Sequence, residues 1–290
     1  ELKEEMDREK NLKPGTPAKN QTGKKTEKTT TNLVSKDPNA VIGPAGYGPQ
    51  MFIQPAGVWS YTAAFENIGS VAAQDVTVTH QLDADLDWST FQLGSLGFGP
   101  LIAFIPAGLT QYQTTISYQN SDASPLDVLV KLDFNVQTGL LTATFTSRDP
   151  RTGQPPEGVL DGFLPPNDAT HIGEGFMQYT VQPKPALITG VAINQQASII
   201  FDINDPLNTP VFTNTIDAGQ PTSQVLPLAP TQANPSFLVT WSGQDDTGGS
   251  GVATYDVYVS DNGAAFPEAK TTLYEPGMCL PCMAAHGRSV

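Results

Sequence analysis

The chain has 290 residues, enough for one large or two ordinary domains, and its 26 Gly and 25 Pro favour short strands and turns over long helices. The formal charge of −14 is unevenly distributed: residues 1–36 hold nine basic and six acidic side chains, and the rest of the chain holds six and 23. Because so acidic a body repels phosphates and anionic lipids, and no apolar run reaches the roughly 18 residues of a membrane span, we expect neither nucleic-acid binding nor membrane insertion of this segment.

Residues 1–36 contain almost no apolar side chains and show no periodicity. A segment of this kind buries too little apolar surface to offset the conformational entropy lost on ordering. The sequence therefore predicts a disordered linker that tethers the folded part of the chain.

The first strong strand pattern begins at Trp59. Aromatic and apolar residues alternate with small polar ones over residues 59–65, and the same alternation returns at 75–79. The intervening segment carries Asn67 and Gly69, residue types that suit turns because Asn bonds to nearby backbone and Gly accepts positive φ. These features predict two β-strands joined by a loop.

More strand patterns follow this pair along the chain. The alternating segments are residues 109–118, 126–134, 140–146, 175–181 and 191–201. The segments 94–106 and 148–170 are rich in Gly or Pro and are expected to be loops. About eight strands separated by turn signals predict a β-sandwich over residues 37–217.

Several short motifs accompany this pattern of strands. They are Gly43-Pro44-Ala45-Gly46, Glu66-Asn67-x-Gly69, Ala73-Gln74-Asp75-Val76-Thr77, Leu82-Asp83-x-Asp85-Leu86-Asp87, Gly162-Phe163-Leu164-Pro165-Pro166 and Asn194-x-x-Ala197-x-Ile199-x-Phe201-Asp202. As a set they resemble the conserved-repeat, immunoglobulin-like domains of large bacterial surface proteins, a group of unknown specific function. The resemblance implies an immunoglobulin-like β-sandwich, an extracellular or cell-surface location and no catalytic residues.

Residues 218–235 are rich in Pro and predict an extended, fairly stiff linker. A second module is expected at 236–264, where two strand patterns, 237–243 and 253–260, flank the acidic, Gly-rich segment 244–251. With one core aromatic in each strand, Trp241 and Tyr255, the pair resembles the first half of a fibronectin type III-like sandwich.

The residues that remain are too few to complete such a module. Residues 265–290 show no strand pattern and predict an irregular C-terminal tail. The predicted fold class is therefore all-β: an immunoglobulin-like β-sandwich plus a truncated second β-sandwich module, with a disordered N-terminal tail. Half a sandwich is expected to leave Trp241, Tyr255 and Val257 poorly covered and a strand edge open.

The tail holds both cysteines of the chain, Cys279 and Cys282, in Cys-x-x-Cys spacing. A zinc site would need two further ligands, and His286 is the one candidate nearby. A redox motif would need a strand that leads into a helix, and the surrounding sequence does not predict one. We expect no function from this pair.

Asp83, Asp85 and Asp87 have the alternate spacing that allows carboxylates in a turn to converge on a cation. Ca²⁺ takes six to eight oxygen ligands, and it is the cofactor that this pattern indicates. The segment is not an EF-hand, because Trp88 occupies the sixth position, where Gly is required, and Gly94 the twelfth, where Glu is required. Two interpretations stay open: a calcium site and a solvated acidic turn.

Two other loops are weaker candidates of the same kind. Asp245 and Asp246 lie beside several Gly residues, and Asp202, Asn204 and Asp205 follow the strand pattern at 191–201. Their side chains are oxygen ligands, which suit Ca²⁺ better than a transition metal.

The sequence contains no motif typical of an active site. It lacks Gly-x-Ser-x-Gly, His-Glu-x-x-His and Gly-x-x-x-x-Gly-Lys. His80 shares a strand face with Val76 and Val78 and is expected to be a packed or rim residue. His171 lies close to Glu174 in a loop, where an acid–base pair is the one catalytic arrangement left open. We expect a protein that is not an enzyme.

These features predict a non-enzymatic structural spacer or adhesion module of a larger extracellular bacterial protein, with Ca²⁺ as a stabilising ion. The expected partners are neighbouring domains of the same polypeptide and a surface glycan or protein. The alternative is a carbohydrate-binding accessory module of a secreted hydrolase, which would present a row of exposed aromatic rings. Five rings in predicted loops can discriminate between the two: Tyr47, Phe52, Phe98, Phe104 and Phe163.

Overall fold

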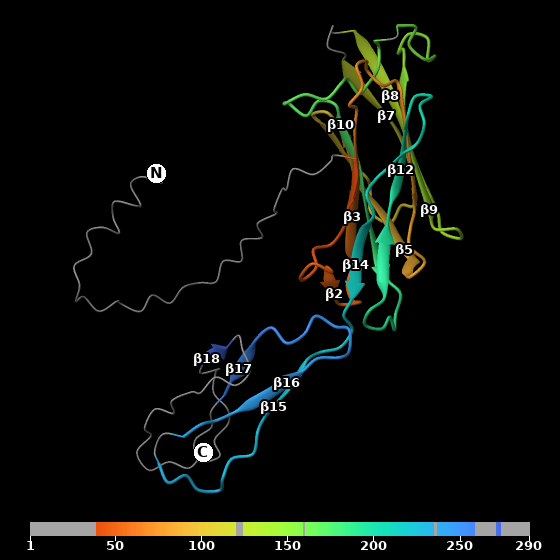
Figure 1. Cartoon of the computed structure of the whole chain (residues 1–290). Coiled ribbons are helices and arrows are strands. Elements are labelled where there is room, and N and C mark those ends of the chain that lie inside the picture. Colours follow the sequence, from red (N-terminus) through yellow and green to blue (C-terminus); the bar gives the residue numbers. More distant parts are fainter. Residues whose placement is uncertain (1–38, 120–123, 159, 235–236, 259–270, 274–290) are drawn as a thin grey trace, which may run out of the picture. The chain divides into compact units, whose positions relative to one another are not determined.

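The computed structural model describes residues 39–119, 124–158, 160–234, 237–258 and 271–273 (Figure 1). The predicted linker at 1–36 and the Cys279/Cys282 pair lie outside these residues. The described part of the chain is all-β, as the sequence predicts, and contains no helix. None of it therefore forms a helix that is long and apolar enough to cross a membrane.

Two antiparallel sheets form a β-sandwich (Figure 1). The first has the strand order β1 (Ala40–Ile42), β3 (Trp59–Glu66), β10 (Glu174–Pro183), β5 (Leu86–Phe98) and β6 (Leu101–Phe104). The second has the order β13 (Leu207–Asn208), β12 (Ala197–Phe201), β4 (Asp75–Gln81), β9 (Leu140–Arg148), β8 (Pro125–Asn135) and β7 (Gln111–Gln119).

A third, smaller sheet joins the beginning and the end of the sandwich. Its strand order is β11 (Ala192–Gln195), β14 (Phe212–Ile216) and β2 (Phe52–Ile53). Strands β11 and β14 pair antiparallel, and β14 and β2 pair parallel. The segment expected as one strand at 191–201 is divided at Gln196, so that β11 belongs to the third sheet and β12 to the second.

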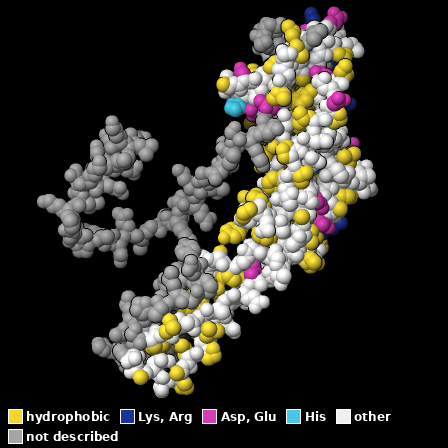
Figure 2. Space-filling model, viewed as in Figure 1, with side chains coloured by type: hydrophobic (Ala, Val, Ile, Leu, Met, Phe, Trp, Pro, Cys, Tyr) yellow, Lys and Arg dark blue, Asp and Glu magenta, His cyan; other side chains and the backbone are white. Residues whose placement is uncertain are grey.

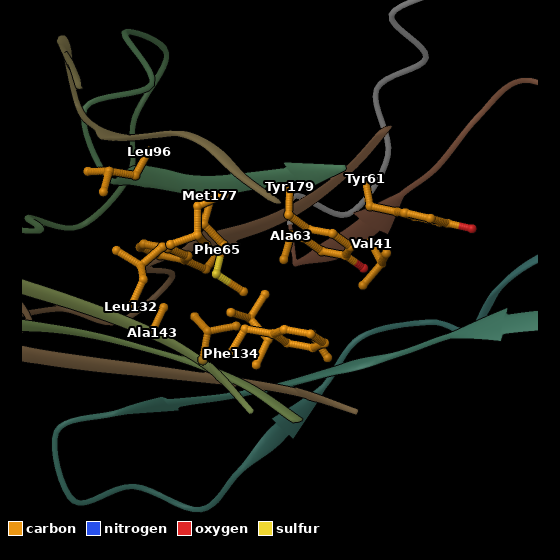
Figure 3. Packing of buried hydrophobic residues seen from close by; sticks show 14 of the residues in the cluster. Val41, Tyr61, Ala63, Phe65, Leu96, Leu132, Phe134, Ala143, Met177 and Tyr179 are labelled. Atoms are coloured by element: carbon orange, nitrogen blue, oxygen red, sulfur yellow. The ribbon is translucent and has the colours of Figure 1, made fainter. Parts of the chain in front are cut away.

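The core forms because one face of each central strand is apolar. In β3, Trp59, Tyr61, Ala63 and Phe65 are buried, and the residues between them are exposed or half-buried. In Figure 3, side chains of the two sheets meet between them: Phe65, Met177 and Tyr179 from the first, and Leu132, Phe134 and Ala143 from the second. The predicted alternation is confirmed for these strands.

The Gly- and Phe-containing segment 94–106 differs from the prediction of a loop. It forms the end of β5 and the whole of β6, which pair as a hairpin. Gly97 is needed here because a Cβ at this position would collide with the carbonyl oxygen of Leu101 and the ring of Phe176. The glycine therefore marks a close approach between strands, which sequence reasoning interpreted as a loop.

The C-terminal part also differs from the prediction. The Pro-rich segment expected as a linker contains β15 (Thr222–Val225), which pairs with β16 (Trp241–Gln244). Strand β17 (Tyr255–Val257) pairs with β18 (Thr271–Leu273), which lies in the tail expected to be irregular. Backbone pairing needs only extended residues with free hydrogen-bonding groups, so polar, poorly patterned segments can supply partner strands.

The two aromatic residues of this part are buried, so the expectation that they are poorly covered is wrong. Trp241 is 6 % and Tyr255 7 % exposed, and their ring centroids lie 6.3 Å apart. Strands β16 and β17 pair with β15 and β18 and not with each other, so the described residues do not form the hairpin of a fibronectin type III-like module.

Candidate functional site

The acidic turn at 83–87 uses its carboxylates as caps for the backbone. Asp83 Oδ1 accepts a hydrogen bond from the Asp85 amide at 2.9 Å, and Asp83 Oδ2 accepts one from the Asn194 amide at 2.8 Å. Asp87 lies in β5, where its Oδ1 accepts from the Ser89 amide and hydroxyl at 3.1 and 2.6 Å. Asp83 thereby ties this turn to β11, and the structure does not bring the three carboxylates together. Calcium binding at this turn stays a prediction.

Asp202 has a similar structural role at the start of β4. Its Oδ1 accepts hydrogen bonds from the amides of Gln74 and Asp75 at 2.8 and 2.9 Å. The residue also has a left-handed φ of 51°, a conformation that Asp tolerates better than most residues. This carboxylate is held against the backbone of the neighbouring strand.

Among the described residues, one group of three acids converges as a metal site requires. Asp217, Asp245 and Asp246 each offer an oxygen that lies within 4.8 Å of the other two. Asp217 follows β14 directly, and the other two follow β16. Sequence reasoning identified Asp245 and Asp246, and it missed Asp217 because a single Asp after a strand carries no local signal for a partner nearly thirty residues away.

Backbone amides hold these carboxylates in place. The Ser250 amide donates to Asp217 Oδ2 at 3.0 Å, and the Gly251 amide donates to Asp245 Oδ2 at 2.6 Å. The other oxygen of each residue, Asp217 Oδ1 and Asp245 Oδ1, is buried and has no hydrogen-bond partner. The group thus combines anchored side chains with unsatisfied ligand atoms.

His80 was expected to be a packed or rim residue, and the structure shows that it is packed in the core. Its Nε2 lies 2.6 Å from Gln195 Oε1, and its Nδ1 lies 3.4 Å from the Tyr179 hydroxyl. These contacts fit a neutral ring that donates from Nε2 and accepts at Nδ1. Burial lowers the pKa of His80 to about 4, against the opposing effect of the Gln195 hydrogen bond. The imidazole packs edge-on against Tyr179 and belongs to a buried polar network.

His171 and Glu174 form the pair that was left open as an acid–base candidate. His171 Nδ1 lies 2.6 Å from Glu174 Oε1, and the hydrogen bond to Glu174, together with its charge, raises the pKa of the imidazole. The His171 side chain is 72 % exposed. Because water screens an exposed pair, the arrangement is a surface ion pair that closes a turn.

Two open hollows lie near the ends of β7 and β8. The larger has a volume of about 500 Å³ and is lined mainly by Pro100, Tyr118, Pro125 and Asp127. The smaller has a volume of about 300 Å³; it shares Asp127 with the larger hollow and is also lined by Arg148 and Asp149. No histidine lines either hollow. Figure 2 shows that acidic side chains lie in small, scattered groups over this face of the molecule.

The five aromatic rings divide into different environments. Phe98 and Phe163 are each 1 % exposed, and they pack against each other in the core with centroids 5.0 Å apart. Phe52 is half-buried, whereas Tyr47 and Phe104 are 61 % and 81 % exposed. Two of the five rings are therefore unavailable to a ligand.

Comparison with solved structures gives several bacterial surface proteins at low similarity. The N-terminal domain of the Streptococcus gordonii adhesin Sgo0707 is 12 % identical at a TM-score of 0.33; the match covers 62 % of this chain and 33 % of that one. The collagen-binding domain of a Staphylococcus aureus adhesin is 14 % identical at 0.31, with 63 % and 99 % covered. Domains D2 and D3 of the Corynebacterium diphtheriae major pilin SpaD are 14 % identical at 0.30, with 57 % and 47 % covered.

The chain thus spans about a third of the length of the Streptococcus gordonii chain that it matches. A comparison with curated proteins found no match. The matching protein family is a domain of unknown function (DUF7619), whose model covers residues 37–97 and 161–217. These two segments contain β1 to most of β5 and β10 to β14, and they leave out β6 to β9.

Proposed function

We propose that this chain is a non-enzymatic structural module, a spacer or adhesion unit of a larger extracellular bacterial protein, and that its sandwich carries tension between neighbouring domains. The observation that carries the proposal is a parallel pair between two strands near the beginning and the end of the sandwich. Strand β14 pairs parallel with β2, with Thr215 opposite Phe52 and Ile216 opposite Ile53.

Parallel pairing decides how tension acts on these strands. Tension from the N-terminal side first loads the three-residue strand β1, which pairs with β3, and then pulls β2 from its N-terminal end. Tension from the other side pulls β14 from its C-terminal end, and in a parallel pair these two ends lie at opposite sides. The strands must slide past each other, so their hydrogen bonds are loaded together. An antiparallel pair pulled from one side opens one bond at a time.

Side chains and backbone add further links at this place. The amide of Asn214, which is fully buried, donates to the carbonyl oxygens of Pro44 and Met51 at 3.1 and 3.2 Å. The Asp217 amide donates to the Ile53 oxygen at 2.9 Å. On its other side β14 pairs with four residues of β11. We call these contacts among 44–53, β11 and β14 the terminal clamp.

The environment of the polar groups agrees with a non-enzymatic role. His80 is enclosed in the core, and His171 is screened by water on the surface. The carbohydrate-binding alternative requires exposed aromatic rings, and Phe98 and Phe163 are buried in the core. Of the five rings, Tyr47 and Phe104 are the exposed ones.

Single-molecule force spectroscopy of the full chain, pulled from its two ends, tests the proposal. Unfolding of residues 40–216 should release roughly 60 nm of chain in one event, at a force well above that needed to open a β-hairpin. Asn214→Ala should lower this force, and Asn208→Ala, at an exposed position of β13, should not. Equal forces for the two variants would contradict the proposed clamp.

A further inference from the structure

Two segments that are distant in the sequence bring three carboxylates to one place. Asp217 ends the terminal clamp, and Asp245 and Asp246 begin the loop that follows β16. The three groups carry like charge and repel each other, yet their oxygens lie within 4.8 Å. Such an arrangement calls for a compensating cation or for hydrogen-bond donors at every oxygen.

The donors do not reach every oxygen. Asp217 is only 9 % exposed, and its Oδ1 has neither a partner nor contact with solvent. The same holds for Asp245 Oδ1. A buried carboxylate oxygen without a partner is strongly unfavourable, and native proteins rarely leave one unsatisfied. The orphaned oxygens therefore indicate a ligand, independently of the charge of the cluster.

Gly249 leaves room for this ligand. A Cβ at this residue would lie 2.8 Å from Asp245 Oδ2, 2.9 Å from Asp246 Oδ1 and 3.0 Å from Asp217 Oδ1. Oxygens of all three carboxylates therefore converge on the side of Gly249 where a side chain would begin. The Cβ position itself lies at bonding distance from the Gly249 Cα, so an ion would sit farther out among the oxygens, on the side that the missing side chain leaves open.

We propose that Asp217, Asp245 and Asp246 bind one Ca²⁺ ion next to Gly249. All three ligands are hard oxygens, without the nitrogen or sulfur that a transition metal prefers. Ca²⁺ accepts a flexible set of six to eight oxygens, whereas Mg²⁺ demands a near-ideal octahedron and keeps several of its waters. Three carboxylates supply up to six oxygens, and water reaches the site on the exposed side of Asp246 to complete the coordination.

The ion would fasten the loop after β16 to the end of β14. This is a binding activity beyond the load-bearing role, and it rests on different residues from those of the parallel strand pair. We therefore expect bound Ca²⁺ to restrain the chain directly after β14, where it leaves the sandwich. The binding measurement and the pulling measurement can therefore fail separately.

Isothermal titration of CaCl₂ into the chelator-treated full chain is the test. We expect one site, and at least tenfold weaker binding in Asp246→Asn, which changes an exposed side chain and spares the fold. Gly249→Ala should weaken binding as much without changing the charge, because its methyl group would crowd the three oxygens that face the ion. Glu157→Gln, at an exposed loop residue that belongs to no candidate site, is the matched charge control and should bind as the wild type does.

Three results would overturn the proposal. The first is no Ca²⁺ binding by the wild type at millimolar concentration. The second is unchanged binding in both Asp246→Asn and Gly249→Ala, with circular dichroism showing native sheet content. The third is binding that survives in these variants and disappears when Asp83, Asp85 and Asp87 are replaced by Asn, which would place the ion in the acidic turn.

Discussion

The buried imidazole of His80 should make the stability of the fold depend on pH. Its pKa is about 4 in the folded chain and about 6.5 when unfolded, because burial disfavours the charged ring. Between these values the unfolded chain takes up a proton that the folded chain excludes, so the free energy of unfolding falls as the pH falls. From pH 7 to pH 5 this one group should remove about 2 kcal/mol.

Urea unfolding of the full chain at pH 7, 6 and 5, followed by circular dichroism, measures this loss. In His80→Gln the same pH change should remove about 2 kcal/mol less than in the wild type, whatever the variant's stability at pH 7. His171→Gln is the control. The pKa of His171 is raised in the folded chain, so this residue stabilises the fold below its unfolded pKa, and the stabilisation is lost as the pH rises. The effect is opposite in sign to that of His80, and it is small because the His171 side chain is exposed. A wild-type slope that His80→Gln leaves unchanged would refute the reasoning.

Four further substitutions test the packing by urea unfolding at pH 7. Phe145→Ala removes a fully buried ring and should lower the free energy of unfolding by about 3–5 kcal/mol. Phe104→Ala removes a ring that is 81 % exposed and should change this free energy by less than about 0.5 kcal/mol. Similar losses in the two variants would contradict the packing. Asn67→Ala should remove roughly 2–3 kcal/mol, because its amide donates to the Val71 and Leu164 oxygens; a neutral result would mean that water replaces it. Gly139→Ala should destabilise by about 1–3 kcal/mol, because φ is +72° and the methyl group would meet the Trp88 ring; wild-type stability would rule out this strain.

Local alternation was enough to predict the core strands. The sequence of β8 places Val128, Val130 and Leu132 on one face and Lys131 on the other, and the structure buries the first three and exposes the lysine. Such a pattern is reliable because adjacent residues of a strand point to opposite sides of the sheet. In the Glu66-Asn67-x-Gly69 motif, the loop was predicted correctly from Asn67 on, whereas Glu66 is the last residue of β3. The hydrogen bond from Asn67 to the Leu164 oxygen could not be predicted from the motif.

Features that depend on distant partners were missed. Strands β16 and β17 lie in predicted strand patterns, but each pairs with a segment whose own sequence is polar or irregular, β15 or β18. The partnership of Asp217 with Asp245 depends in the same way on the path of the chain after β14. Sequence periodicity reports which side of a strand is buried, and it contains no information on which strand or carboxylate lies beside it.

A comparison of two pulling directions tests the load-bearing claim most directly. In a chain with Cys279→Ser and Cys282→Ser, new cysteine handles at Gln111 and Asp133 would pull apart the open end of the antiparallel β7–β8 pair. This pair should open bond by bond at low force, whereas the same chain pulled from its termini should resist to a clearly higher force. Terminal unfolding at the same force or a lower one would contradict the account of this protein as a tension-bearing module.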